Sequence, residues 1–569
     1  MEGTNHSKVS PMTFMYRSLL ALGILLFTAG CGGGGDTAES ASVGGESSFS
    51  TPRVYGIPVY APPQSPEEYG LAPLDDAAFD ALDPAQRYKV AIKLYGSLYY
   101  GTDPKSFRQS VDSGRFVSET RALFERENAA SEIAAVEDKV GEYGGYGDAE
   151  LVGRMLARLY EMKPGRAYIN RWAAYVLTQT ILFSPAYELD TVYSVDAIDV
   201  FANLVRGFDE GQSLQWVTFT HMVSDENWRR FRSPEDNGRE MLEIYTMDFN
   251  DAHVPLAGKA LKNWRLDRRS DTLVVGLDAN TEPIRGLFPD RTVTDGTDFY
   301  SALVLEPAFV PSVTRRLVDI YFPDYTESQK ESIGRRIAKS RPGRWSDILK
   351  QIVFSREYLL HSHKTRSFEE SFFQIAKTLG WVPKKYSFYR LARNLDAMHQ
   401  STMRYKLGRK VEVPLDSQSF AWYHKTIREN VMTNYETNVS WEAGGDGGWP
   451  LSDLYAELPA DLIADDELDE RGRKQESWYA NERRRAAYIV NDLFVPIAGR
   501  EATAEEIGAL ADLIDDRKHD RQTFDNPSWV DLYGNRDPKD DRKERGYFAQ
   551  MVLNYLSRLD MVYEFEKVQ

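Results

Sequence analysis

The chain is poor in cysteine and histidine. Its 569 residues include one Cys, at position 31, and eight His. A single thiol excludes intramolecular disulfides, cysteine-rich zinc sites and the Cys-x-x-Cys-His attachment of a covalent haem. The position of this one cysteine is therefore more informative than any cysteine pattern.

Long apolar runs and common catalytic motifs are also missing. The apolar run Leu19–Phe27 is nine residues long, whereas a membrane-spanning helix needs about 20. The sequence contains no Gly-x-Ser-x-Gly, no His-Glu-x-x-His, no Walker loop, and no Gly-x-Gly-x-x-Gly after an expected strand. The enzyme classes that depend on these motifs are thereby excluded.

The overall charge is strongly negative. The chain has 69 Lys and Arg against 86 Asp and Glu, a net charge of −17. Such a chain repels phosphate backbones, so we expect no nucleic acid among its partners. No run of Lys and Arg stands out as a basic patch. A hydrophobic content of 42% with 27% charged residues is typical of a folded globular body.

The N-terminus has the pattern of a signal peptide. Lys8 and Arg17 precede the apolar run, and "TAGC", Thr28–Cys31, follows it. This order resembles a bacterial lipobox, in which small residues precede a cysteine that is cleaved, lipidated and left as the new N-terminus. We therefore expect residues 1–30 to be a lipoprotein signal peptide and Cys31 to carry lipid. The alternative is a plain secretory signal with an incidental cysteine.

The next segment, 31–74, begins with a Gly/Ser-rich stretch and is predicted to be a flexible tether. Gly32, rather than Asp, follows the cysteine, which in Gram-negative lipoproteins resembles an outer-membrane destination. The lipid at Cys31 is the only membrane contact that we expect. The folded body would face the periplasm or the cell surface.

Beyond residue 75 the apolar spacing is mainly helical. "LDPAQRYKVAIKLYG" has Asp83 as a predicted N-cap and Pro84 at the first helical position. Only "DTLVVGLDANTEPIRGLF", 271–288, alternates as a β-hairpin does, with a turn at Asp278–Asn280. We predict a mainly α fold, a multi-helical array with this small insertion. Its expected regions are 75–212, 213–385 and 386–569.

A weak internal repeat suggests that the helical modules are duplicated. "ILFSPAYEL" at 181–189 matches "IVFSREYLL" at 352–360, and "MVLNYLSRLDMVYEF" near the C-terminus is a looser third copy. Before the second and third copies, a Phe-x-Pro element precedes a threonine, Thr326 or Thr503, that starts a Glu-containing helix in capping-box style. Such modules need their neighbours to cover their apolar faces.

One predicted helix, 233–246, is rich in acids. Ser233 and Pro234 start it, and an apolar stripe runs along one side. The stripe consists of Gly238, Met241, Leu242, Tyr245 and Phe249. The acids Asp236, Glu240 and Glu243 cluster roughly opposite, and Arg239 lies four residues from both Glu235 and Glu243.

This acidic face has two interpretations. It is the salt-bridged polar side of an amphipathic helix, or it lines a cleft in which close carboxylates do acid–base work or hold a metal ion. For the second, the candidate catalytic residues are Glu240, Glu243, His221 and Arg239. The candidate metal ligands are Asp236, Glu240, Glu243 and His221. His221 is alternatively a hydrogen-bonded core residue.

"SPEDNGREMLEIYTMDFND", followed by "AGKALKNWRL", resembles the signature of bacterial domain-of-unknown-function family 1800. The likeness continues through "FYSALVLEPAFVPSVTRRLVDIYF", "ILKQIVFSREYLL" and "RSFEESFFQIAKTLGW", and covers roughly 213–385. Tyr245 replaces the family's usual His, and Asn263 its usual Gly. The resemblance implies a helical protein that is secreted or located in the envelope, with no established activity.

The Phe-Ser-Pro segments also resemble helical domains of secreted planctomycete-type proteins that carry haem modules. Without Cys-x-x-Cys-His, covalent haem is not carried over, and the cofactor stays unknown. Two functions remain open. The first is a lipid-anchored envelope protein that acts as a binding or assembly component with a protein partner. The second is a metal-dependent or acid–base hydrolase acting on envelope or polysaccharide material.

Overall fold

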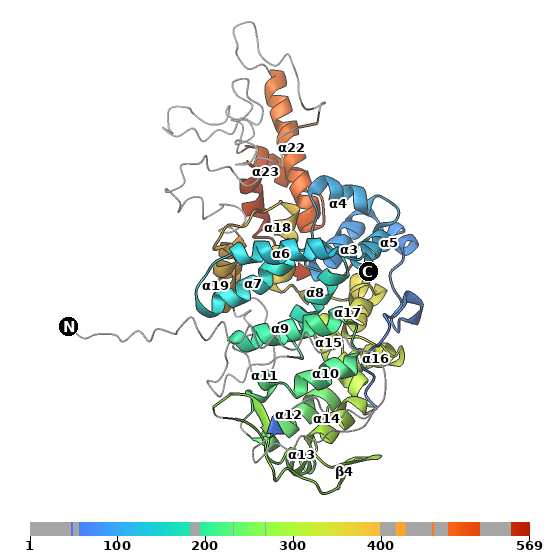
Figure 1. The fold of residues 1–569 in the computed structure, drawn as a ribbon. Coiled ribbons are helices and arrows are strands. Elements are labelled where there is room, and N and C mark those ends of the chain that lie inside the picture. The colour runs from blue at the N-terminus through green and yellow to red at the C-terminus, as the bar shows by residue number, and fades with distance from the viewer. Residues whose placement is uncertain are drawn as a thin grey trace, which may run out of the picture. The chain divides into compact units, whose positions relative to one another are not determined.

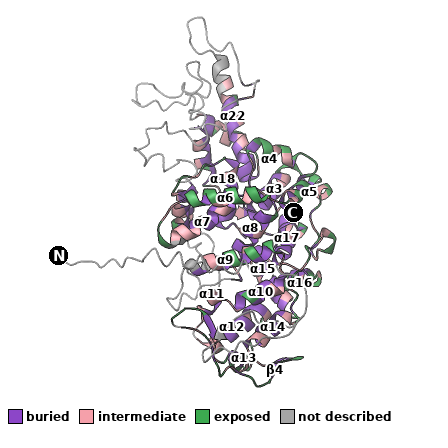
Figure 2. Cartoon of the chain, in the orientation of Figure 1, coloured by how far each residue is buried: buried purple, intermediate pink, exposed green. Residues whose placement is uncertain are grey.

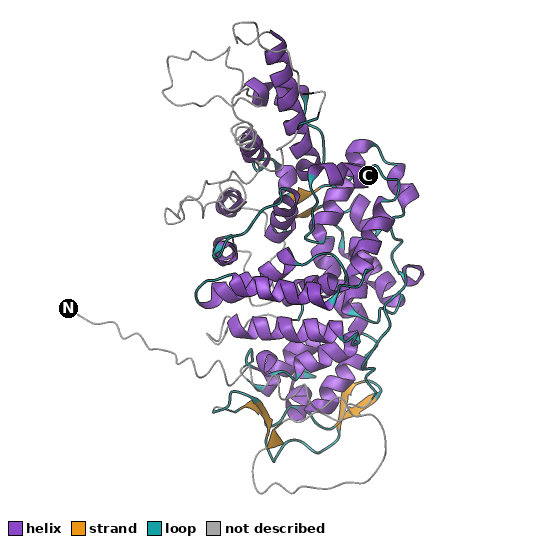
Figure 3. Ribbon diagram, turned by 45° about the horizontal axis from the view of Figure 1, so that its top comes forward, coloured by secondary structure: helices purple, strands orange, loops and turns teal. Residues whose placement is uncertain are grey.

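The predicted mainly α fold is confirmed: helices make up most of the described chain, and the strands are short (Figures 1 and 3). The computed structural model describes residues 47–48, 56–182, 194–231, 233–267, 269–398, 417–427, 458–459, 462, 476–512 and 548–569. Ser47–Gln569 is one compact unit, so the expected regions 75–212, 213–385 and 386–569 are not separate bodies. The predicted signal peptide and Cys31 lie outside the described residues.

The helices follow one another with short connections. In the first part of the chain they are α2 (Asp76–Asp80), α3 (Pro84–Ser97), α4 (Pro104–Val111), α5 (Phe116–Glu125), α6 (Ala130–Glu142), α7 (Gly147–Glu161), α8 (Arg166–Thr178), α9 (Ser194–Asp209), α10 (Leu214–Met222), α11 (Asp225–Trp228), α12 (Pro234–Thr246) and α13 (Val254–Ala260). Further along they are α14 (Gly296–Leu305), α15 (Phe309–Tyr321), α16 (Glu327–Lys339), α17 (Trp345–Val353), a π-helical turn (Glu357–His361), α18 (Phe368–Thr378), α19 (Ser387–Ala397), α20 (Ser417–Ile427), α22 (Glu476–Ala498) and α23 (Ala504–Asp512). None of the helices in the described part of the chain combines the length and apolar character needed to cross a bilayer.

The predicted tether 31–74 extends too far. Residues 56–74 belong to the folded body, where Ile57, Leu71 and Leu74 are buried. The main chain of this segment is tied to distant parts of the sequence, for example by Leu74 N donating to Phe354 O at 2.9 Å. Buried apolar side chains and paired main-chain groups hold residues 56–74 against the helices, despite their Pro-rich composition.

The β-insertion is larger than the single hairpin expected at 271–288. β2 (Trp264–Leu266) pairs antiparallel with β3 (Leu273–Val275), and β1 (Ser47–Ser48) adds to the other edge of β3. A second antiparallel pair, β4 (Ile284–Phe288) and β5 (Arg291–Val293), follows. The predicted turn at Asp278–Asn280 instead links the two small sheets, because each strand has a nearer partner on its other side (Figure 3).

The second and third repeat copies have matching structures. Each is a helix that ends at a fully buried serine, Ser355 or Ser557, whose hydroxyl donates to a carbonyl three residues back, at 2.8 Å and 3.0 Å. Each then runs into a two-residue strand, β6 (Lys364–Thr365) or β7 (Glu564–Phe565), and the two strands pair antiparallel. Residues 183–189 of the first copy lie outside the described residues.

The capping boxes predicted before these two copies are present. Gln329 N donates to Thr326 Oγ1 at 3.4 Å, and Thr326 N donates to Gln329 Oε1 at 2.9 Å. Glu506 and Thr503 exchange the equivalent bonds at 3.2 Å and 2.8 Å. Both boxes satisfy main-chain donors at the start of a helix, α16 or α23.

α3 is the helix around which the core is arranged. Asp83 caps it as predicted, accepting from Gln86 N at 2.9 Å. Every residue from Val90 to Ser97 is buried, so α3 is covered on all sides rather than along one stripe. It packs against α18, α22 and α4. Figure 2 shows the buried residues running through these inner helices.

Two polar groups inside this core have dedicated partners. Lys93, only 1% exposed, donates to the carbonyl of Ser362 at 2.5 Å and to its hydroxyl at 3.0 Å. Burial, reinforced by the nearby Lys364, lowers the pKa of Lys93 well below its usual value. At the end of α3, Trp172 Nε1 donates to Ser97 O at 3.0 Å and so satisfies a carbonyl that the helix leaves open.

The C-terminal strand closes this core. The ring of Phe565 lies against Gly96, where an added Cβ would come within 2.8 Å of it. The guanidinium of Arg366 sits over the other part of the ring, 4.4 Å from its centroid. Lys89 bonds Glu566 at 2.5 Å. The last residues of the chain are thereby fixed onto a helix near its beginning.

We predict that Phe565→Ala lowers the free energy of unfolding by about 3–5 kcal/mol, because it removes a fully packed aromatic ring and leaves a cavity against Gly96. Phe249→Ala is the matched control: this ring is 66% exposed, and its loss should change the free energy by less than about 0.5 kcal/mol. Urea unfolding followed by tryptophan fluorescence measures both. Equal losses in the two variants would show that the C-terminal strand is not part of the core.

Candidate functional site

The acidic helix forms where the sequence predicts it. Ser233 Oγ accepts from Asp236 N at 3.1 Å, and Pro234 begins α12. Gly238 allows a close approach to α13, since a Cβ there would meet the Cβ of Ala257 at 2.7 Å. The predicted stripe is buried from Gly238 to Tyr245. Phe249, placed in the stripe, lies beyond the end of the helix and is exposed.

The predicted ion pairs within the helix are not formed. Arg239 is exposed, and among the described residues it makes no ion pair with Glu235 or Glu243. The arginine that contacts the helix comes from α15 instead. Arg316 donates to the carbonyls of Ile244 at 2.8 Å and of Glu243 at 2.6 Å, so it neutralises the C-terminal end of α12.

Glu240 is the acid with a perturbed ionisation. It is half-buried, and burial followed by repulsion from Glu243 and Asp236 raises its pKa. Arg230 and Arg316 act in the opposite direction. The carboxyl is therefore held closer to its neutral form than an exposed glutamate, a property shared by general acids.

His221 is a core residue, but it does not have the expected hydrogen bond. It is 6% exposed, and its Nε2 has no hydrogen-bond partner in the described structure. Burial, reinforced by the nearby Arg230, lowers its pKa to about 3. The imidazole is therefore neutral at any physiological pH. In this state it carries one N–H and one lone pair and is not a cation.

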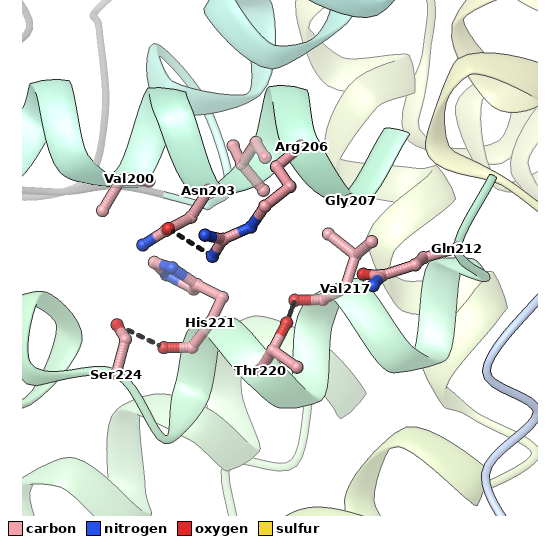
Figure 4. A pocket seen from close by; sticks show the side chains of 10 residues that line it. Val200, Asn203, Arg206, Gly207, Gln212, Val217, Thr220, His221 and Ser224 are labelled. Atoms are coloured by element: carbon pink, nitrogen blue, oxygen red, sulfur yellow. Dashed lines mark hydrogen bonds between the residues drawn. The ribbon is translucent and has the colours of Figure 1, made fainter. Parts of the chain in front are cut away.

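His221 borders a small crevice between α9 and α10, where its ring points toward Asn203 (Figure 4). The crevice has a volume of about 150 Å³. Its floor is apolar, from Val200, Leu204 and Val217, and its rim includes Arg206, which bonds Asn203 at 2.8 Å. At about 30 Å³ per molecule, this space holds only a few waters.

The structure does not assemble the proposed metal ligands. In the residues that it describes, no group of three or more His, Cys, Asp or Glu side chains could hold a metal ion. This applies to Asp236, Glu240, Glu243 and His221. Arg230 is a buried cation that is electrostatically coupled to both His221 and Glu240. A metal ion at this position would be repelled by that guanidinium.

Tyr245, at the position where the resembled family has His, is also structural. It is 1% exposed and packs against Phe309, with the ring centroids 6.3 Å apart. Burial raises its pKa, so its phenol stays protonated. Of the residues singled out in the sequence, Glu240 alone combines partial solvent access with a shifted pKa.

A larger concave site lies elsewhere. We call it the basic groove: a cavity of about 710 Å³ between the 56–64 segment, the start of α10, the α14–α15 junction and the end of α16. Its apolar wall is made by Pro58, Pro307, Val310 and Pro311. Arg335, Lys339 and Arg341 stand on the opposite side, and one acid, Glu306, also lines it.

The groove depends on contacts between segments far apart in sequence. Leu214 N donates to Gly343 O at 2.9 Å, Ser213 N to Val59 O at 2.8 Å, and Arg344 Nε to Ala61 O at 2.6 Å. These bonds hold its two walls together without help from a ligand. The volume falls within the range of about 300–1,000 Å³ found for ligand pockets.

The sequence analysis missed the groove, although one signal was available. "RRIAKSRPGR", 335–344, has five Lys or Arg and no acid in a chain of net charge −17. Among the described residues, neither Lys339 nor Arg341 forms an ion pair with a carboxylate. The apolar wall could not be read from the sequence, because it comes from prolines about 250 residues apart.

The comparisons with known proteins find nothing similar: no family model matches the chain, and no curated protein or solved structure matches it. The resemblance to family 1800 therefore stays a prediction.

We predict that His221 makes the protein sensitive to acid. An unfolded chain takes up a proton on this ring near pH 6.5, whereas the folded chain resists until about pH 3. The stabilising effect is thus complete above pH 6.5 and is lost as the pH falls, at about 1.4 kcal/mol per pH unit. His221→Gln, which does not titrate, should lose less stability than the wild type between pH 6.5 and pH 4.

Urea unfolding across this pH range measures the difference. Parallel curves for the two proteins would mean that the ring is already protonated in the folded state, or is solvated there.

Proposed function

We propose that this chain is a lipid-anchored protein of the cell envelope, attached through Cys31, whose body is a binding or assembly component. The lipobox-like sequence and Gly32 support an outer-membrane lipoprotein, and the resemblance to family 1800 supports an envelope location. The basic groove is the observation that supports binding. We propose that it holds an acidic, extended segment of a partner protein.

The chemistry of the two walls supports this occupant. Pro58, Pro307 and Pro311 offer an apolar surface without hydrogen-bond donors, which suits apolar side chains. Lys339 and Arg341 face the same space and lack carboxylate partners among the described residues. An extended segment places alternate side chains on opposite sides, so one that alternates acidic and apolar residues satisfies both walls at once.

The alternative is a metal-dependent or acid–base hydrolase acting on envelope or polysaccharide material. The raised pKa of Glu240 is the observation in its favour. However, a hydrolase of this kind needs a second group to activate water. The neighbours of Glu240 that influence it most are two further acids on the same helix and two arginines. The groove therefore supports binding better than the acidic helix supports catalysis.

The anchor makes the first prediction. When the chain is expressed in a Gram-negative host fed labelled palmitate, the wild type should take up label and sediment with membranes. Cys31→Ala should take up no label, because the acceptor thiol is gone. Gly32→Ala, a change beside the acceptor, is the control and should keep the label. Label that persists in Cys31→Ala would disprove lipidation at this residue.

The groove makes the second prediction. A fluorescein-labelled peptide of alternating Glu and Leu should bind the protein, and Lys339→Glu with Arg341→Glu should weaken binding by roughly five- to tenfold, about 1–1.4 kcal/mol. Fluorescence anisotropy at low salt gives both dissociation constants. Lys163→Glu with Arg285→Glu reverses one Lys and one Arg on exposed positions outside the groove, and should have no effect.

The same peptide with Lys in place of Glu tests the sign of the charge. If it binds as well as the acidic peptide, or if the control pair weakens binding equally, the groove is not the binding site.

A further inference from the structure

A second surface, on α7 and α19, combines exposed tyrosines with unpaired cations. We call it the tyrosine–lysine patch: Tyr146, Tyr386 and Tyr389 with Lys384, Lys385 and Arg393. α7 and α19 pack side by side, which brings the start of α7 next to the start of α19 (Figure 1). Tyr146 is 70% exposed, the largest exposed fraction of any described tyrosine among the exposed apolar residues, and Val382 beside the patch is 64% exposed.

The tyrosines form an ordered cluster. The ring of Tyr146 stacks on Tyr386, with centroids 6.2 Å apart and planes at 15°, and meets Tyr389 edge-on at 5.9 Å. The glycines before Tyr146 make room for the cluster, since a Cβ on Gly145 would come within 2.8 Å of the Tyr389 ring. The cluster is therefore built by the local backbone and is not a chance meeting of loose side chains.

The faces of two of these rings are already in use. Lys385 Nζ lies 5.3 Å from the centre of Tyr386, and the Arg393 guanidinium lies 5.8 Å from that of Tyr389. A platform for sugar rings needs a free aromatic face, so this patch is a poor one. Outward, it offers phenol hydroxyls, cationic groups and the side chain of Val382.

The cations have no carboxylate to neutralise them. Among the described residues, Lys384, Lys385 and Arg393 form no ion pair, although all three are exposed. The surrounding sequence is also basic: residues 382–410 contain eight Lys or Arg and one Asp, a net charge of +7 in a chain of −17. The structure of residues 399–410 is not described, and the patch does not depend on them.

We propose that the tyrosine–lysine patch is a binding surface for anionic phospholipid headgroups. Tyrosine sits well at a bilayer surface, because its ring is apolar and its hydroxyl is wet. Lysine and arginine are attracted to anionic lipids, and an exposed valine adds apolar contact. This inference takes its setting from the proposed envelope location but is independent of the basic groove.

The patch would give the proposed lipid anchor a second contact. If residues 31–55 are a flexible tether, a coil of this length has a root-mean-square span of about 25–30 Å, so the lipid alone leaves the orientation of the body free. A headgroup site on the body would hold it against the membrane in one orientation.

Vesicle sedimentation of residues 32–569 tests the proposal. This chain keeps the whole compact unit Ser47–Gln569 and lacks the acceptor cysteine, so lipidation cannot contribute to binding. We expect it to sediment with phosphatidylglycerol-containing vesicles but not with pure phosphatidylcholine, and less at high salt. Lys384→Glu, Lys385→Glu and Arg393→Glu together should lower the partition coefficient by roughly tenfold or more.

Two further variants keep the result interpretable. Lys163→Glu, Lys262→Glu and Arg285→Glu together make the same change in net charge at exposed sites elsewhere, and should bind as the wild type does. Tyr146→Ser removes an exposed ring that no core residue needs, and should weaken binding severalfold even if the triple variant is unstable.

Three results would overturn the proposal: no sedimentation with either vesicle, equal sedimentation with both, or equal losses in the patch and control triples. A soluble acidic polysaccharide that binds the patch while vesicles do not would also overturn it. Because neither lipidation nor the groove peptide enters this assay, its failure is distinct from failure of the proposed function.

Discussion

Lys93 lies in the middle of a helix that is buried on every side, and the surrounding structure is arranged to tolerate it. Its ammonium group has lost its water, and it is compensated by the carbonyl and hydroxyl of one residue, Ser362. Ser362 follows directly after the π-helical turn Glu357–His361. That turn, in turn, is fixed by Tyr358, whose phenol bonds Ser97 on the same central helix at 2.7 Å. A buried polar group without such partners costs several kcal/mol, so α3, the π-helical turn and β6 constrain one another.

The acidic helix shows the same dependence on distant partners. Its carboxylates have the spacing for local ion pairs, yet the charges that matter to it come from Arg230, just before α12, and Arg316 on α15. Arg230 favours an ionised Glu240 and disfavours a protonated His221. A neutral imidazole and a half-buried glutamate coexist here because a buried guanidinium lies near both. The basic groove, by contrast, is open, and its cations are not committed to other groups in the described structure.

Local features were predictable from the sequence, and long-range ones were not. Caps at Asp83, Ser233, Thr326 and Thr503 depend on three or four consecutive residues and were found where expected. The periodicity of Val90, Leu94 and Leu98 gave the helix α3 but not its complete burial, which comes from α18 and α22. The hairpin at 271–288 was misplaced because β2 and β5, its actual partners, lie just outside the window. Neither the groove nor the tyrosine–lysine patch could be assembled without knowing which helices are neighbours.

The pairing of the last strand with the middle of the chain has a consequence for the order of events in folding. Lys89 and Glu566 are 477 residues apart in sequence, and Phe565 fills the space above Gly96. α3 therefore cannot acquire its complete surroundings while the C-terminus is still on the ribosome. Contacts of such long sequence separation form late and slow folding. A nascent or truncated chain would expose apolar surface on α3, which makes chain completion itself the step that separates a folded molecule from one open to proteolysis.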